Sequence, residues 1–286
     1  MAMNIVINNL FRSSEEANAP TGDDYIGEDG LWYCGKCHTV KQTRVSYLGE
    51  ERMPFVPCRC RQAEIDAAEE EQRRFTREMQ LMNARETCFA DSMLWKWNFE
   101  NCDDPDDKLI LSMKKYCEHF DDLYTDGCGL FLYGPVGTGK TYAAACVANE
   151  LIEKGISVHL TDFSRVINTL WDQKDGKQKY LDRLNSFELL IIDDLAAERN
   201  TPYANEIIMN VIDSRCKSGK PLIVTTNLTA EELFKPTDMC RQRIYSRICE
   251  MCIPVLCNAS RDRRKAKMAR NMNKYREIRW VEAFTA

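Results

Sequence analysis

The stretch Gly134-Pro135-Val136-Gly137-Thr138-Gly139-Lys140-Thr141 decides the fold of this 286-residue chain. It matches the phosphate-binding loop, in which a glycine and four further residues precede Gly-Lys-Ser/Thr. An apolar run at 129–133 precedes it and an alanine-rich run at 142–152 follows it. These runs predict a buried strand and a helix. Strand, glycine-rich turn and helix form the context in which the motif binds phosphate, so we predict a nucleotide site here rather than a bare turn.

The residue types of this loop suit a triphosphate. Glycines let the backbone curl so that several N–H groups point at one anion, and the helix that follows adds the positive end of its dipole. We expect all eight residues to bind ATP, with Lys140 reaching the β- and γ-phosphates. The hydroxyl of Thr141 is expected to bind Mg²⁺.

Two carboxylates follow a second apolar run, at 189–192. Such a short and wholly apolar run predicts a central parallel strand, and ligand sites of open α/β sheets lie where such strands end. We expect Asp193 to hold Mg²⁺ and Asp194 to polarise the attacking water. The alternative is a solvated Asp-Asp turn after a buried strand.

A third predicted strand, 221–227, ends in Asn227. Its amide could position the water between the γ-phosphate and the two acids, although an asparagine at the end of a strand also commonly begins a turn. These runs alternate with predicted helices at 165–171 and 205–215. The alternation predicts an α/β fold, a P-loop core with a parallel sheet between helices.

At these segments the chain resembles AAA+ ATPases. Residues 134–141, 189–194 and 225–227 are similar to the Walker A, Walker B and sensor I segments of that family. The stretches 193–200 and 212–227 more specifically resemble the DnaC/DnaI-type replicative helicase loaders and their relative, the transposition helper IstB. The resemblance covers about residues 95–270. Ala196 stands where the family usually has glycine, a departure that we do not expect to affect nucleotide chemistry.

The resemblance implies further roles. Residues 243–248 are similar to the arginine-finger segment, and Arg247, with Arg243 as runner-up, is expected to reach the γ-phosphate of a neighbouring subunit. The alternative is two surface arginines in salt bridges. Residues 260–264 resemble the sensor II region, from which Arg263 is assigned to the nucleotide. Residues 95–100 are expected near the adenine.

The N-terminal third contains two closely spaced cysteine pairs: Cys34, Cys37, Cys58 and Cys60. Four thiolates that converge on one tetrahedral ion form a common structural zinc site. A segment this short has too little core to fold alone, so Zn²⁺ would supply the folding energy. His38 could replace a cysteine, although its adjacency to Cys37 makes that awkward; four free thiols are the other alternative. In DnaI-like loaders a zinc-bearing N-terminal domain contacts the helicase, whereas IstB-type helpers are not expected to have one.

These features predict four regions along the chain: a flexible N-terminus at 1–29, a zinc knuckle at 30–61, a linker helix at 62–92 and the ATPase domain at 93–280. The linker prediction rests on 61–86, which is heavily charged and has neither proline nor glycine.

The composition favours a reducing cytoplasm. The first 20 residues show no basic segment followed by an apolar one, and no run of 18 apolar residues predicts a membrane span. The cysteines outside the knuckle, such as Cys249, Cys252 and Cys257, are therefore expected to be buried reduced thiols rather than a second metal or redox site. A net charge of −5 argues against a general DNA-coating protein. Residues 261–279 nevertheless hold nine Lys or Arg against two acids, and form either a contact for single-stranded DNA or a solvated helix face.

Together these observations predict an AAA+ ATPase that uses ATP, Mg²⁺ and Zn²⁺ to load a hexameric replicative helicase. Single-stranded DNA and further copies of the chain, joined through the ATPase domain, are its other expected partners. An IstB-like ATPase helper of a DNA transposase is the alternative. A nucleotide switch with negligible hydrolysis is a third candidate.

Overall fold

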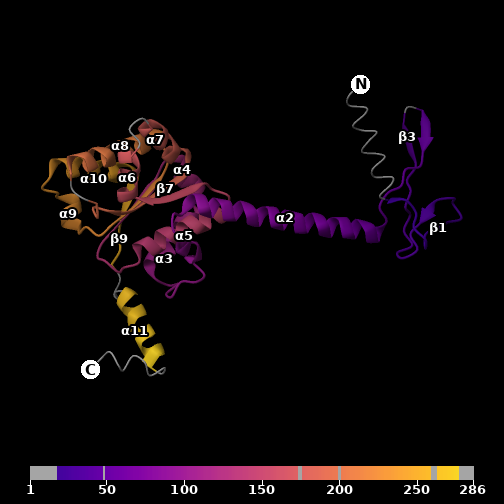
Figure 1. The fold of residues 1–286 in the computed structure, drawn as a ribbon, viewed down its shortest axis with the longest axis horizontal. Helices are drawn as coiled ribbons and strands as arrows, with labels where there is room; N and C mark the ends of the chain where they lie inside the picture. Colours follow the sequence, from indigo (N-terminus) through magenta and orange to yellow (C-terminus); the bar gives the residue numbers. More distant parts are fainter. Residues whose placement is uncertain (1–17, 48, 173–175, 199–200, 259–262, 277–286) are drawn as a thin grey trace. The chain divides into compact units, whose positions relative to one another are not determined.

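The computed structural model describes residues 18–47, 49–172, 176–198, 201–258 and 263–276 (Figure 1). The chain divides into two compact units, residues 1–79 and 80–286, which are described separately.

The first unit is a small, turn-rich domain. Its strands form two antiparallel pairs: β1 (Tyr25–Ile26) with β2 (Trp32–Tyr33), and β3 (Val45–Tyr47) with β4 (Glu50–Arg52). The helix α2 (Arg59–Cys88) begins in this unit. The buried ion pair between Asp24 and Lys41, at 2.6 Å, joins the start of the unit to its middle.

The expectation of a flexible segment at 1–29 is wrong for residues 18–29. Residues 1–17 lie outside the described part. The carboxylate of Asp24 accepts N–H groups from Thr21 and Gly35, and the ammonium of Lys41 donates to the carbonyl of Ala19. Residues 18–29 therefore belong to the folded unit, because their polar groups satisfy a lysine that would otherwise be buried without partners.

The second unit is a layered α/β domain. Its helices are the end of α2, η1 (Ser92–Lys96), α3 (Lys108–Glu118), α4 (Phe120–Thr125), α5 (Lys140–Glu153), α6 (Phe163–Asp172), α7 (Lys177–Ser186), α8 (Pro202–Ser218), α9 (Ala230–Phe234), α10 (Met239–Met251) and α11 (Arg263–Arg276). Its strands are β5 (Gly129–Tyr133), β6 (Val158–Asp162), β7 (Leu189–Leu195), β8 (Leu222–Thr226) and β9 (Cys252–Leu256). They form one parallel sheet in the order β6-β7-β8-β5-β9.

Helices cover both faces of this sheet (Figure 1). Leu132 and Ile191 point into a core that contains α3 and α5, whereas Phe131 and Ile192 point into a core that contains α6, α8 and α10. Successive strand residues thus alternate between two buried layers, which is why the residues of β5 and the first four residues of β7 are all apolar. The predicted P-loop core, with its parallel sheet between helices, is confirmed.

The topology brings three chain segments to one edge of the sheet. Strand β8 lies between β5, which leads into the phosphate-binding loop, and β7, which leads into the two acids. All three strands run in the same direction, so their carboxyl ends meet. None of the described helices is both long and apolar enough to cross a membrane.

Candidate functional site

The backbone of the phosphate-binding loop curls around the side chain of Lys140. Gly134, Gly137 and Gly139 have φ values of 133°, 86° and 93°, which side chains with a Cβ disfavour. The Nζ of Lys140 is buried and donates to the carbonyls of Gly134 and Pro135, at 2.8 Å each. Helix α5 begins directly at Lys140, so its free N–H groups lie at the loop, as an anion site requires.

A continuous hydrogen-bonded chain joins this loop to the two acids. The hydroxyl of Thr141 donates to Oδ1 of Asp193 at 3.0 Å, and the hydroxyl of Thr225 donates to the same oxygen at 2.6 Å. Thr225 in turn accepts the N–H of Asp194 at 2.9 Å, and Asn227 Nδ2 donates to Oδ1 of Asp194 at 2.7 Å. The structure therefore brings Thr141 of the loop together with the side chains predicted at the ends of β7 and β8.

The electrostatics of Asp193 suit a bound cation. Burial raises the pKa of its carboxyl group, the neighbouring Asp194 adds to that rise, and the hydroxyls of Thr225 and Thr141 oppose it. A buried carboxylate whose charged form is disfavoured gains stability from a nearby positive ion. Hydroxyl and carboxylate oxygens are also the ligands that Mg²⁺ prefers, so Thr141 and Asp193 fit the expected ion.

A cavity of about 790 Å³ opens at this edge of the sheet. It is lined by Lys96, Trp97, Asn101, Asp103, Gly137, Gly139, Lys140, Thr141, Tyr142, Asp193, Asp194, Thr225, Asn227, Arg263, Arg270 and Asn271. The rings of Trp97 and Tyr142 lie 5.5 Å apart, and together they form its aromatic part. Its size falls within the range of small-molecule sites, and its polar groups converge on the loop.

The segment before the core is held against α5. Asn149 Nδ2 donates to the carbonyls of Leu94 and Trp97, at 2.9 Å each, and the hydroxyl of Tyr142 donates to the carbonyl of Asn98 at 2.8 Å. Of the segment 95–100 that we expect near the adenine, Lys96 and Trp97 line the cavity. Its contact with the base stays a prediction.

Arg263 lies on the phosphate-binding loop. Its N–H donates to the carbonyl of Gly137 at 3.0 Å, and its guanidinium is 2.9 Å from a carboxylate oxygen of Asp107. A Cβ added to Gly139 would stand 3.0 Å from the Arg263 side chain, so the glycine makes room for it. Residues 260–262, the rest of the expected sensor II segment before Arg263, lie outside the described residues.

Arg247 does not line the cavity. It is exposed on α10, 3.4 Å from Asp213 and 2.8 Å from Glu250. Glu250 also raises the pKa of Arg247. The single chain thus places this arginine in surface ion pairs, away from its own site, and its role in a neighbouring subunit stays a prediction. Arg243, the runner-up, is also exposed on α10.

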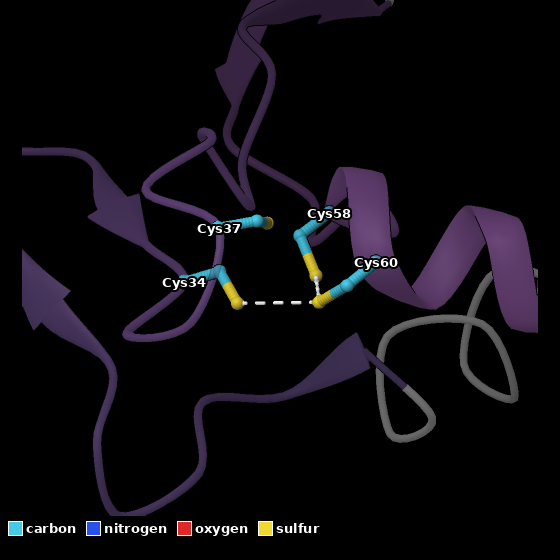
Figure 2. Close-up of side chains that lie close together, drawn as sticks. All are labelled: Cys34, Cys37, Cys58 and Cys60. Atoms are coloured by element: carbon cyan, nitrogen blue, oxygen red, sulfur yellow. Dashed lines mark hydrogen bonds between the residues drawn. The ribbon is translucent and has the colours of Figure 1, made fainter.

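The four N-terminal cysteines converge (Figure 2). Their sulfur atoms all lie within 4.8 Å of one another, and the Cys58–Cys60 and Cys34–Cys60 pairs are 3.3 and 3.6 Å apart. A tetrahedral zinc ion with Zn–S distances of about 2.3 Å requires sulfurs about 3.8 Å apart, so the donor set fits Zn²⁺. Cys60 lies in the first turn of α2, because the helix begins two residues before the end of the predicted knuckle.

Hydrogen bonding activates one of these thiols. The Thr39 hydroxyl, 3.0 Å from the sulfur of Cys37, is the largest cause that lowers the pKa of this thiol to about 5. A thiol that deprotonates readily is a good metal ligand. His38 is not part of the group; its ring nitrogen lies 3.3 Å from the hydroxyl of Tyr25.

The remaining cysteines in the described segments are free thiols. Cys252 and Cys257 are buried, and burial raises the pKa of both. Cys249 is half-buried. In the part of the chain that the structure describes, these three cysteines are not among the residues of the candidate metal-binding group, and the expectation of reduced thiols stays a prediction.

Thr225 is a site residue to which the sequence assigned no role of its own, although it lies in the segment 225–227. It lies in β8, two residues before Asn227, which directly follows the strand. Its position two residues before Asn227 could have marked Thr225 as a candidate site residue. Arg270 and Asn149 carry no such signal, because only the folded chain brings α11 and η1 to the loop.

Comparisons with known proteins agree with this geometry. The curated replicative helicase loader DnaI of Bacillus subtilis is 33% identical over 138 residues, which cover 46% of this chain and 44% of DnaI. The replicative helicase loader DnaC of Escherichia coli is 29% identical over 127 residues, which cover 43% of this chain and 50% of DnaC. The chain thus spans about half the length of the curated relatives that it matches.

Solved structures show the same fold. A crystal structure of DnaI covers 62% of this chain and 95% of its own, with a TM-score of 0.51 and 23% identity. A crystal structure of the DnaC helicase loader covers 59% of this chain and 100% of its own, with a TM-score of 0.51 and 24% identity. The sequence model of one family, described as IstB-like ATP binding protein, matches residues 62–269. Because that match covers well over half of the sequence, the chain belongs to the family of IstB-like ATP binding proteins.

Proposed function

We propose that this protein is an ATP-dependent loader of a replicative DNA helicase. The observation that carries the proposal is the hydrogen-bonded chain from Thr141 through Asp193 to Asn227, beside a cavity of nucleotide size. The similarity to the loaders DnaI and DnaC supplies the biological role.

Lys140 and the members of this hydrogen-bonded network each have a task in ATP hydrolysis. Lys140, which now donates to two loop carbonyls, turns to the β- and γ-phosphates. Thr141 and Asp193 would hold Mg²⁺, which would supply positive charge beside the phosphates. Asp194 orients the attacking water and accepts its proton, while Asn227 keeps the Asp194 carboxylate in place.

The active assembly contains several copies of the chain. In it, Arg247 of one copy reaches the γ-phosphate of the next, where a guanidinium stabilises the developing charge. The ion pairs of Arg247 with Asp213 and Glu250 are exposed, and exposed ion pairs are weak because water and salt screen them. These ion pairs therefore do little to keep Arg247 from reaching the γ-phosphate of the neighbouring copy.

The first unit supplies the contact with the helicase. With Zn²⁺ bound by its four cysteines, this small domain keeps a fixed surface that a partner can recognise. Single-stranded DNA is the second partner. Exposed basic side chains of α11, among them Lys265 and Arg270, are suited to its phosphates.

Size-exclusion chromatography with light scattering tests this function. The full chain is mixed with the hexameric replicative helicase of the same organism, with and without ATP and Mg²⁺. We expect a complex larger than either protein. It should be weakened by Lys140→Ala, which removes the phosphate contact, and lost in Cys58→Ser, which removes a zinc ligand. An unchanged elution of both proteins under every condition would contradict the loader function.

A transposase helper is the second candidate, because the matching family model is that of IstB-like proteins. The same experiment separates the two. A chain that ignores the helicase but elutes with a DNA transposase from the same organism would establish the helper function instead.

A further inference from the structure

The turn that follows Asp194 is strained. Asp194 and Ala196 have φ values of 58° and 75°, in the left-handed region that residues with a Cβ avoid. The N–H of Ala197 donates to the carbonyl of Asp194 at 3.2 Å and closes a four-residue turn. A positive φ at the third residue of such a turn normally requires glycine, yet this chain has Ala196 there.

The backbone conformation of this strained turn sets the direction of the Asp194 side chain. The register of β7 against β8 shifts between Ile192 and Leu195, so a bulge contains both acids. Bulges beside active sites re-aim side chains. Here the Asp194 carboxylate lies 2.7 Å from Asn227 Nδ2, while its N–H bonds to Thr225. A relaxed turn would rotate the backbone of Asp194 and move its carboxylate away from these partners.

Glu198 holds the turn from outside the cavity. One of its carboxylate oxygens accepts the N–H of Ala196 at 2.9 Å, directly at the strained residue. Glu198 is half-buried, and the charges that face it come from Arg241 on α10, which favours its ionised form, and from Asp194, which opposes it. It is not among the described residues that line the cavity, so any effect on the reaction passes through the turn.

We propose that Glu198 is a positioning residue for ATP hydrolysis, which keeps Asp194 aligned by holding the N–H of Ala196. The inference rests on the proposed ATPase function. The hydrogen bond from the Ala196 N–H to Glu198 stabilises the strained turn. With glycine at position 196 this hydrogen bond would be unnecessary, because glycine adopts a positive φ without strain.

Steady-state ATP hydrolysis by the full chain tests the inference. In Glu198→Ala we expect kcat to fall by about tenfold or more, since small misplacements of a catalytic group are costly, while KM for ATP changes less than about twofold. Glu198→Gln keeps an oxygen acceptor and should retain most of the activity. The double variant Ala196→Gly/Glu198→Ala should recover most of the lost kcat. Glu206→Ala, an exposed glutamate on α8, is the matched control and should behave as wild type.

Two results would overturn the inference: a Glu198→Ala protein with wild-type kcat, or a double variant no faster than Glu198→Ala. Asp194→Asn serves as a reference. If it hydrolyses ATP as fast as wild type, the proposed ATPase site itself has failed. Melting temperatures test whether the hydrogen bond between Glu198 and the Ala196 N–H stabilises the turn. Glu198→Ala should lower the melting temperature of the wild-type background more than that of the Ala196→Gly background, and equal shifts would overturn the role of Glu198 in the turn.

Discussion

At the scale of single residues, Arg263 joins the C-terminal helix to the phosphate-binding loop. Its backbone donates to Gly137, and its side chain lies against Gly139 and beside Asp107. A guanidinium in this place can donate to phosphate oxygens, and hydrogen bonds between charged groups are about twice as strong as neutral ones.

Arg263→Ala should therefore weaken ATP binding by about 10-fold, the effect of losing about 1.5 kcal/mol from a charged hydrogen bond. The dissociation constant of a fluorescent ATP analogue, measured at constant salt, gives the readout. Arg74→Ala, which removes an exposed arginine of α2, is the control. A variant at position 263 that binds the analogue as tightly as wild type would show that Arg263 does not contact the nucleotide.

His159 links stability to pH. Burial lowers the pKa of its imidazole, despite the contact of Nδ1 with the carbonyl of Thr87 at 3.0 Å. The unfolded chain, with an ordinary pKa of about 6.5, binds a proton before the folded chain does, so stability is lost as the pH falls below that value. The melting temperature should drop less between pH 7.5 and 5.5 in His159→Gln than in wild type. An equal drop would contradict this, and His119→Gln, at an exposed histidine, is the control.

Residue roles were predictable where chemistry demands a fixed spacing. The loop and the two acids belong to short motifs, so the sequence indicates Lys140, Thr141 and Asp193 directly. Arg270 was not predictable as a cavity residue. It reaches the site, with a bidentate ion pair to Asp103, only because α11 lies near the loop that precedes α3.

At the scale of elements, buried strands were the easiest to predict and edge elements the hardest. Strand β5, the first four residues of β7 and the first three residues of β8 form continuous apolar runs, since both faces of these strands are covered. Strand β9 is different. It contains Pro254 and has exposed residues, and it is tolerated because it pairs only with β5, at the edge of the sheet. The short helices η1 and α4 depend on packing against α5 and α3 rather than on local propensity.

The zinc knuckle is the element whose stability depends most on a ligand. A stoichiometric zinc ion should be found by metal analysis of the purified chain. Chelation, or Cys58→Ser, should make residues 18–58 sensitive to protease while the ATPase unit keeps its melting transition, because the two units have separate cores. Cys240→Ser, a cysteine of α10 outside the group, is the control. Protease resistance that survives full removal of zinc would contradict a structural metal.

At the scale of the whole molecule, the proposed loader couples an ATPase unit to a partner-binding unit in one chain. Helix α2 runs through the boundary between the units, and its last residues, such as Cys88, are buried in the core beside α5. A helix in this region was predictable from the charged, proline-free and glycine-free run before the core. The partner was not predictable from spacing or periodicity, since one fold serves many functions, and it rests on similarity to the loaders.

The central claim is that the intact chain hydrolyses ATP at the site built around Asp194. The most direct test compares ATP turnover by the 286-residue wild type and Asp194→Asn, with Mg²⁺ and single-stranded DNA present. We predict that the variant binds ATP as wild type does but hydrolyses it at least about 100-fold more slowly, as expected for the loss of a general base. Equal turnover by the two proteins would contradict the account.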